Sequence, residues 1–322
     1  MRFRYFALAV LCGLAVGGAA SAQSWPSKPV HIVVAFTAGG PSDTVARLLA
    51  EWLTKIHGQQ FLVDNRPGAG GNIGAEAVAK SAPDGYTLLL GSPGALATSP
   101  FLYKNLGFDA RKDFTAITMV ADMPILFAAS PKLPVNSMPE LIDYARRNPG
   151  KLAYGSGGNG TVGHLAAELF KHLANVDLLH VPYRGSAQLL PDLVAGRLDI
   201  TVDNLAGAMR FVQAGQVRAL AITTDKRLPA FNTIPTAQEA GFAGFIASSW
   251  SHLFGPAKLP ADITLSLNRN VNAYVASEEG SKRLIALGFV PVGGTPEDLE
   301  RTVRADMARW GPVIGKLGIK LD

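Results

Sequence analysis

Glycines and short polar side chains gather in a loop between a strand-like and a helix-like run of the sequence. The segment KLAYGSGGNGTVGHLAAELFKHL holds Gly155, Gly157 and Gly160 in the order G-x-G-x-x-G, with which a dinucleotide-binding fingerprint begins. That fingerprint also needs an acidic residue at the end of the next strand, to hold the ribose hydroxyls. The next strand-like run ends in Tyr183 and Arg184 instead. A nicotinamide site is therefore not predicted, and no other cofactor is expected.

The same loop has the chemistry of an anion site. Residues Ser156 to Thr161 precede a helix, so free backbone N–H groups and the positive end of the helix dipole would face whatever lies at the loop. Residues Thr37 to Ser42 offer the same arrangement in the first half of the chain. Glycine lets a ligand approach the backbone closely, and short hydroxyl and amide side chains add donors. Two such loops across a cleft would suit an anion, and a carboxylate fits at least as well as a phosphate.

Each glycine loop also has an ordinary structural explanation, because turns between strands and helices commonly use glycine and a Ser, Thr or Asp cap. In GAGGNIG, Gly68, Gly70 and Gly74 miss the fingerprint spacing, so we expect a structural turn without ligand contact there. For the other two loops we expect ligand contact. Asp43 is expected to complete the first helical turn rather than to act as a base, since a free carboxylate would repel a nearby anion.

A hydrolase would need a nucleophilic serine beside a histidine base. The candidates are the serines Ser42, Ser92 and Ser156 with His164 or His180, and none of the serines lies in a G-x-S-x-G elbow. His164 is expected to pack against or hydrogen-bond to the loop before it, and His180 to be a core residue. The histidines form no H-x-x-x-H pair, so no metal site is predicted.

Two acids, Asp199 and Asp203, bracket the strand-like run DITVDN. Asp203 and Asn204 lie at its carboxyl end, which points toward the expected cleft. Ligand contact and a strand-to-helix cap are equally good explanations for this pair.

The first residues have the pattern of a cleavable signal peptide. Arg2 and Arg4 precede an apolar run, and residues 20–22 form an A-x-A cleavage site, so residues 1–22 are predicted to be removed on export. The apolar run is shorter than the roughly 20 residues of a membrane span. We therefore expect a soluble periplasmic protein without cysteine, whose stability comes from burial. The formal charge of +5 includes these two arginines, which leaves about +3 on a surface of interspersed charges, so no nucleic-acid partner is predicted.

The order of the apolar segments predicts an α/β fold. Three strand–loop–helix units open the chain, as in a parallel sheet with right-handed crossovers. The run 116–130 is long for one strand and is expected to leave the first sheet for a second, and the run 245–255 is expected to return. Two lobes with two hinge crossings form a clamshell, while one large continuous sheet is the alternative. The predicted bounds are 26–128 and 248–322 for lobe 1 and 129–247 for lobe 2.

Five segments together resemble the Bug-type solute receptors of tripartite tricarboxylate transporters: WPSKPVHIVVAFTAGGPSDTVAR, VDNRPGAGGNIGAEAVAKSAPDGYTLLLGS, GSGGNGTVGHLAAELF, HVPYRGSAQLLPDLVAGRLDI and IPTAQEAGF. The resemblance covers nearly the whole mature chain in order. It implies a type II periplasmic binding protein, not an enzyme, that captures a small dicarboxylate, tricarboxylate, amino or aromatic acid. It also implies membrane transporter subunits as partners, and we expect a monomer.

The resemblance further implies which residues bind the ligand. In that family the loops that match Thr37 to Asp43 and Ser156 to Thr161 hold one carboxylate, largely through backbone amides and ordered water, and the residues that match Ser92 and Asp203-Asn204 line the other side. The chain has Thr37 and Ala38 where the family often has Ala or Ser followed by Pro, which leaves the choice of ligand open. The predicted ligand-binding residues are Thr37, Ala38, Gly39, Gly40, Ser42, Asp43, Ser92, Ser156, Gly157, Gly158, Asn159, Gly160, Thr161, His164, Asp203 and Asn204. An exported serine hydrolase acting on small esters remains the alternative.

Overall fold

The structure is a computed structural model that describes residues 25–321, so the predicted signal peptide lies outside the described residues. Three parallel strands open the described chain, β1 (Val30–Val34), β2 (Phe61–Asn65) and β3 (Thr87–Gly91), with β1 between the other two. Each is followed by a loop and a helical segment, as the sequence predicts. The main helices are α1 (Pro41–His57), α2 (Asn72–Ala79), α3 (Ser99–Leu102), α4 (Met138–Arg147), α5 (Val162–Ala174), α6 (Ser186–Ala195), α7 (Leu205–Gln213), α8 (Ala261–Ala276), α9 (Glu278–Ala286) and α10 (Pro296–Leu317).

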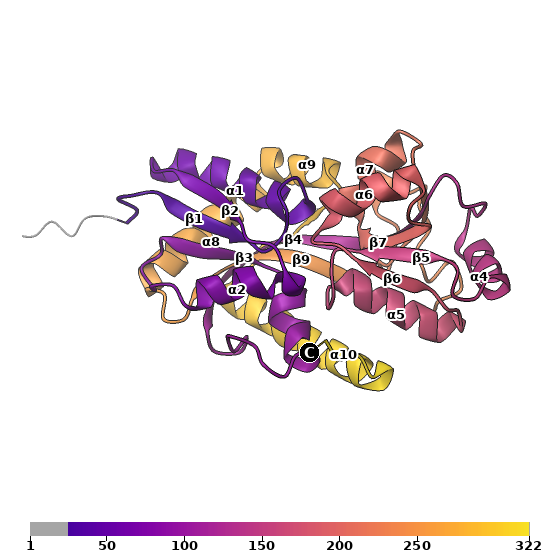
Figure 1. Ribbon diagram of the computed structural model, residues 1–322. Helices are drawn as coiled ribbons and strands as arrows, with labels where there is room; N and C mark the ends of the chain where they lie inside the picture. Colours follow the sequence, from indigo (N-terminus) through magenta and orange to yellow (C-terminus); the bar gives the residue numbers. More distant parts are fainter. Residues whose placement is uncertain (1–24, 322) are drawn as a thin grey trace, which may run out of the picture.

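Two long strands connect the halves of the molecule and run through the middle of Figure 1. Strand β4 (Phe114–Ala129) pairs with β9 (Ser248–Pro256) from Phe114 to Pro124. From Ile125 on it pairs with β7 (Ile200–Asn204) and β8 (Arg218–Ile222). The expectation that this segment leaves one sheet for another is therefore confirmed. The second sheet is completed by β5 (Ala153–Ser156) and β6 (Leu179–Pro182), and the short β10 (Val290–Pro291) pairs with β4.

Hydrogen bonds run without a break from β2 to β6, in the order β2-β1-β3-β9-β4-β7-β5-β6. The molecule nevertheless has the expected two-lobe architecture, because apolar clusters cover both faces of the sheet in each half; one of them also includes Leu102, Trp310 and Ile314 of the first lobe. In β1, Ile32 faces one cluster and Val33 the other, and in β4 Phe127 and Leu126 divide in the same way. This follows from the two-residue period of a strand that is covered on both sides. The lobe bounds given above stay a prediction.

Local sequence signals explain where several helices begin. Thr295 and Asp298 form a complete capping box at the start of α10. The sequence Ser137-Met138-Pro139-Glu140 also predicts a capping box, which is half formed. The Ser137 hydroxyl accepts from the Glu140 amide, but the Glu140 carboxylate accepts from the amide of Asn136, one residue earlier than a capping box requires. Both devices satisfy amides that a helix start would otherwise leave unpaired.

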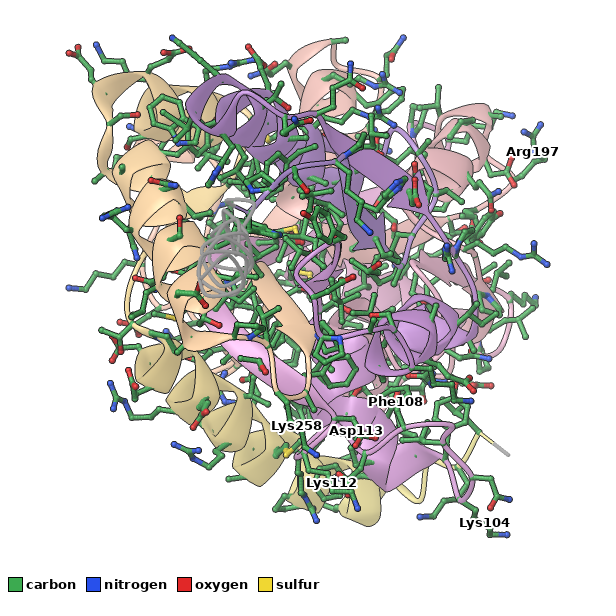
Figure 2. All side chains as sticks on the ribbon, turned by 90° about the vertical axis from the view of Figure 1, so that its left-hand side faces the viewer. Lys104, Phe108, Lys112, Asp113, Arg197 and Lys258 are labelled. Carbon is green, nitrogen blue, oxygen red and sulfur yellow. The ribbon has the colours of Figure 1, made fainter. Side chains whose placement is uncertain are left out.

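Charged side chains lie at the outline of the molecule, as the labelled Lys112 and Arg197 show in Figure 2. Lys112 lies 3.3 Å from the carboxylate of Asp109, and Arg197 is paired with Asp192. Positive and negative groups are therefore interspersed on this surface, and exposed pairs of this kind contribute little to stability.

Candidate functional site

A cavity of about 30 Å³ lies where loops of both lobes meet beside the crossing strands. Several of its walls are the carboxyl ends of parallel strands and the helix starts that follow them, which is where open α/β sheets bind ligands. Seven predicted site residues line it: Gly40, Ser42, Ser92, Gly157, Thr161, Asp203 and Asn204.

Two backbone amides of the loop before α1 donate hydrogen bonds within the loop and the first turn of the helix. The Gly39 amide donates to Oδ2 of Asp43 at 2.9 Å, and the Gly40 amide donates to the carbonyl of Thr37 at 3.4 Å. The first helical hydrogen bond of α1 runs from Thr44 to Gly40 at 3.0 Å, so the amide of Ser42 comes before the helical ladder. The donors that this loop can offer a ligand therefore lie nearer the helix than the glycines do.

Asp43 completes the first turn of α1, as predicted. Burial raises the pKa of its carboxyl, but hydrogen bonds from Arg47, the Gly39 amide and Asn65 outweigh that effect and hold the pKa below its usual value. Two of these bonds come from the guanidinium of Arg47, at 2.9 and 3.0 Å. Hydrogen bonds to the loop and to Arg47 therefore occupy this carboxylate, which is unsuited to act as a base.

The loop between β5 and α5 is also tied internally. The Gly158 amide donates to Oγ of Ser156 at 3.2 Å, and the Gly160 amide donates to Nδ1 of His164 at 3.2 Å. The Thr161 hydroxyl caps α5 by accepting from the His164 amide. Gly157, together with the start of α5, faces the cavity. The expectation that His164 bonds to the preceding loop is confirmed.

Two stacked histidines lie behind this loop. The rings of His164 and His180 are 4.3 Å apart, and Nε2 of His180 is 2.8 Å from Oγ of Ser156. Burial lowers the pKa of His164 to about 4 and that of His180 to about 3, so both are neutral at neutral pH. Ser156 has a histidine partner, but its side chain is fully buried and does not line the cavity.

The remaining predicted residues lie around the cavity rather than in it. Gly39 lines a neighbouring groove with α6 and α7, while Gly158 and Asn159 line a groove on another side, with residues 67–71. Thr37, Ala38, Asp43, Ser156, Gly160 and His164 line none of these three hollows. The structure thus divides the predicted site into a cavity lining and a supporting layer.

Four buried polar atoms of predicted site residues have no hydrogen-bond partner: Oγ1 of Thr37, Oγ of Ser92, Oδ2 of Asp203 and Oδ1 of Asn204. The last three belong to residues that line the cavity. Buried polar groups in folded proteins are nearly always hydrogen-bonded, so each such atom requires an explanation. A polar ligand or ordered water in the cavity would satisfy them.

Sequence reasoning missed part of the lining. Gly185 and Ser186 form the start of α6 after β6, which is the same strand–glycine–helix signal that identified the other two loops. Met123, Ile125 and Ser249 come from the crossing strands, and nothing in their local sequence marks them. The other lining residues not predicted are Phe36, Pro41, Gly94, Val162 and Gly163.

In residues 25–321 no helix is long and apolar enough to span a membrane, and no group of three His, Cys, Asp or Glu side chains could hold a metal ion.

Comparisons with known proteins place this fold and cavity in a family. The sequence profile described as "Tripartite tricarboxylate transporter family receptor" matches residues 45–319. Protein BugT of Bordetella pertussis is 35% identical over 302 residues, which are 94% of this chain and 93% of BugT.

Two solved structures resemble the whole described chain. The structure described as Rpa4515 of R. palustris with adipate has a TM-score of 0.90 and 43% identity, over 92% of this chain and 99% of that one. MatC (Rpa3494) of Rhodopseudomonas palustris with bound malate has a TM-score of 0.86 and 33% identity, over 90% of this chain and 99% of that one. The chain therefore belongs to the family of tripartite tricarboxylate transporter receptors.

Proposed function

We propose that this protein is a periplasmic receptor that captures a small carboxylate between its lobes and delivers it to a tripartite tricarboxylate-type membrane transporter. The ligand class comprises dicarboxylates, tricarboxylates, amino acids and aromatic acids. The observation that carries the proposal is the cavity between the lobes, where the starts of α1 and α5 meet three unpartnered polar atoms. The positive ends of two helices favour a negative group there.

The relatives support the same ligand class. The Rpa4515 structure contains adipate and the MatC structure contains malate, and both are dicarboxylates. Family membership supports both the periplasmic location and the transporter as partner. The protein is proposed to act as a monomer.

Isothermal titration of the exported chain with adipate, malate and related acids tests the function. We expect saturable binding of one carboxylate per chain and recovery of the ligand unchanged. The matched control is adipamide, which has the length of adipate but no charge and should not bind, because the helix starts favour an anion. A chain that binds none of the acids, or binds the diamide equally well, would contradict the proposal.

Ligand is expected to make the protein more compact in solution. The chain crosses between the lobes in β4 and β9, and ligand contacts on both sides of the cavity favour hinge closure. Small-angle X-ray scattering should therefore report a smaller radius of gyration with saturating ligand than without it. Identical profiles would indicate a single rigid unit.

Replacing Ser156 with alanine is expected to weaken carboxylate binding by about tenfold at most. The Ser156 hydroxyl is buried, and its bonds go to His180 and the Gly158 amide rather than into the cavity. One such hydrogen bond is worth roughly 0.5–1.5 kcal/mol, and about 1.4 kcal/mol is a factor of ten in Kd. Titration of the variant measures the loss.

The same variant tests the alternative of an exported serine hydrolase. The family members and solved relatives are receptors and binding proteins, so the wild-type protein is expected to turn over no small ester. Multiple-turnover hydrolysis that disappears specifically in Ser156→Ala would show that Ser156 is a nucleophile, and it would overturn the proposal that this protein is a receptor.

A further inference from the structure

Asp203 places a buried carboxyl in the wall of a cavity that otherwise suits an anion. The residue is 7% exposed and lines the cavity at the end of β7. Its Oδ2 has no hydrogen-bond partner, and its Oδ1 is 3.4 Å from Nδ2 of Asn204. An ionised carboxylate in this position would repel a bound carboxylate, so the site needs a way to remove that repulsion.

No ion pair in the described part of the chain removes it. The titratable side chains on the elements packed around Asp203 are Asp43, Arg47, Glu51, Lys55 and His57 on α1, Asp122 on β4, Tyr154 on β5, His164, Glu168, Lys171 and His172 on α5, His180 on β6, Tyr183 and Arg184 in the loop before α6, Asp192 on α6 and Arg210 on α7. In residues 25–321 none of them forms an ion pair with Asp203, and Arg47 is already paired with Asp43. Burial raises the pKa of Asp203 to about 6, while the neighbouring Ser186 side chain and Asn204 backbone act to lower it.

We propose that Asp203 takes up one proton when a carboxylate enters the cavity, and that the neutral acid then donates a hydrogen bond from Oδ2 to the ligand. The proton comes from solvent and adds to a carboxylate oxygen, and no bond of the ligand is broken. The inference rests on the proposed carboxylate-binding function. It adds that the receptor binds its ligand together with a proton.

The expected size of the effect follows from Coulomb's law. Two negative charges about 5 Å apart at an effective dielectric constant of about 20 shift a pKa by about two units. Because burial already raises the pKa of Asp203 to about 6, the added charge of a ligand raises it further, through neutral pH. At pH 7 the carboxyl is mostly ionised before binding and mostly protonated afterwards.

A ligand with an ammonium group is the competing explanation for the unpartnered oxygen. The ammonium would pair with the ionised carboxylate, and such a ligand would bind without proton uptake. Asp203→Asn would then lose affinity for that ligand. The two explanations therefore predict opposite results for the same variant.

The experiment is isothermal titration of the wild-type protein with malate and adipate at pH 7, in two buffers with different ionisation enthalpies. We expect uptake of close to one proton per ligand. The affinity should fall by about tenfold in total between about pH 6.5 and pH 8, because the bound form holds more protons than the free form. Asp203→Asn should show no uptake and no pH dependence in this range, and it should bind more tightly than wild type at pH 8.

Two conservative variants serve as controls. Asp199→Asn changes a carboxyl at the other end of β7, which accepts from the Ala153 amide at 2.7 Å. Asp122→Asn removes a carboxyl on β4 whose pKa burial and Asp306 raise to about 6, and which does not line the cavity. Both should keep the proton uptake of wild type. His164 and His180 are already neutral at pH 7 and cannot supply the signal.

Carboxylate binding without proton uptake would overturn this inference and leave the proposed function intact. Uptake that persists in Asp203→Asn would overturn it as well, because another group would then be taking the proton. Binding restricted to ligands with an ammonium group, lost in Asp203→Asn, would replace it with the ion-pair explanation. Absence of any carboxylate binding would overturn the proposed function and this inference with it.

Discussion

Replacing Gly70 with alanine is expected to weaken ligand binding by about 100-fold without a change in any cavity residue. A Cβ at Gly70 would lie well inside van der Waals contact of the Asn159 carbonyl oxygen, across the junction of the two lobes. Beside this contact the hydroxyl of Thr98 donates to the Gly160 carbonyl at 2.7 Å. The Asn159 carbonyl belongs to the backbone and cannot rotate away as a side chain could. Closure around the ligand would therefore be obstructed.

The magnitude follows from the population of the closed state. If the added methyl group disfavours closure by about 3 kcal/mol, the apparent Kd rises by about 100-fold. Part of the binding free energy is then used to shift the protein back to its closed, ligand-binding state. Titration measures the affinity, and small-angle scattering should show that the variant stays extended at ligand concentrations that compact the wild type.

Gly58 provides a matched control for backbone strain. It has φ +67, close to the φ +64 of Gly70, but a Cβ there would meet nothing within 4 Å. Both alanine variants should lose about 1–2 kcal/mol of unfolding free energy, since alanine disfavours a left-handed backbone. Gly58→Ala should keep its affinity. Equal affinities in the two variants would mean that the contact at Asn159 plays no part in closure.

Gly70 also illustrates which part of the site the sequence could not predict. The GAGGNIG segment was predicted to be a structural turn without ligand contact, because its spacing matches no ligand-binding fingerprint. It does not line the cavity, but it lies against Asn159, 89 positions later in the chain. No local pattern encodes such a contact, since it depends on how the two lobes meet.

Patterns within a single segment predicted helices and strands much better than they predicted contacts between the lobes. Hydrophobic spacing in the sequence predicts a helix at residues 162–173, which is α5, and the predicted long strand at residues 116–130 is β4. Both depend on hydrophobic periodicity, which neighbouring residues determine. Met123 and Ile125 of β4 line the cavity because of where that strand exchanges partners. That register is set by pairing with β9 and β7, so it could not be derived from β4 alone.

The start of α6 was predicted only in part. The apolar spacing of the sequence predicts a helix from Gln188, but α6 begins at Ser186, directly after Gly185, whose φ is +145. Helix boundaries depend on local hydrogen bonding at the ends and shift by one or two residues easily. Because of this two-residue error, Gly185 and Ser186 were not predicted as site residues, although both line the cavity.

Replacing Gly157 with aspartate is expected to weaken carboxylate binding by more than 100-fold at pH 8. Gly157 lines the cavity, and a Cβ built on it would lie 3.4 Å from Oδ1 of Asp203. The new carboxylate would therefore enter the space that the ligand's negative group needs. Two like charges about 5 Å apart at an effective dielectric constant of about 20 repel by about 3 kcal/mol, which is more than a factor of 100 in Kd.

Gly157 is a better test position than its neighbour Gly158. Gly158 has φ +132, and a Cβ there would lie 2.9 Å from the Tyr183 carbonyl oxygen, so any side chain would strain the loop whether or not it carried a charge. At Gly157 the backbone is free of that constraint, and the nearest atom to the new Cβ is in the ordinary contact range. The charge can therefore be tested without forcing the loop to rearrange.

Gly157→Asn is the control that separates charge from volume, because asparagine has nearly the shape of aspartate without its charge. Any loss that the two variants share measures the space taken from the ligand, and the further loss in Gly157→Asp measures repulsion. Repulsion raises the pKa of the new carboxyl, so lowering the pH should neutralise it and bring the aspartate variant toward the asparagine variant. Titration of both variants at pH 6 and pH 8 measures the difference. If the two bind equally at pH 8, the ligand's negative group does not lie near Gly157, and the loop before α5 is not the anion site.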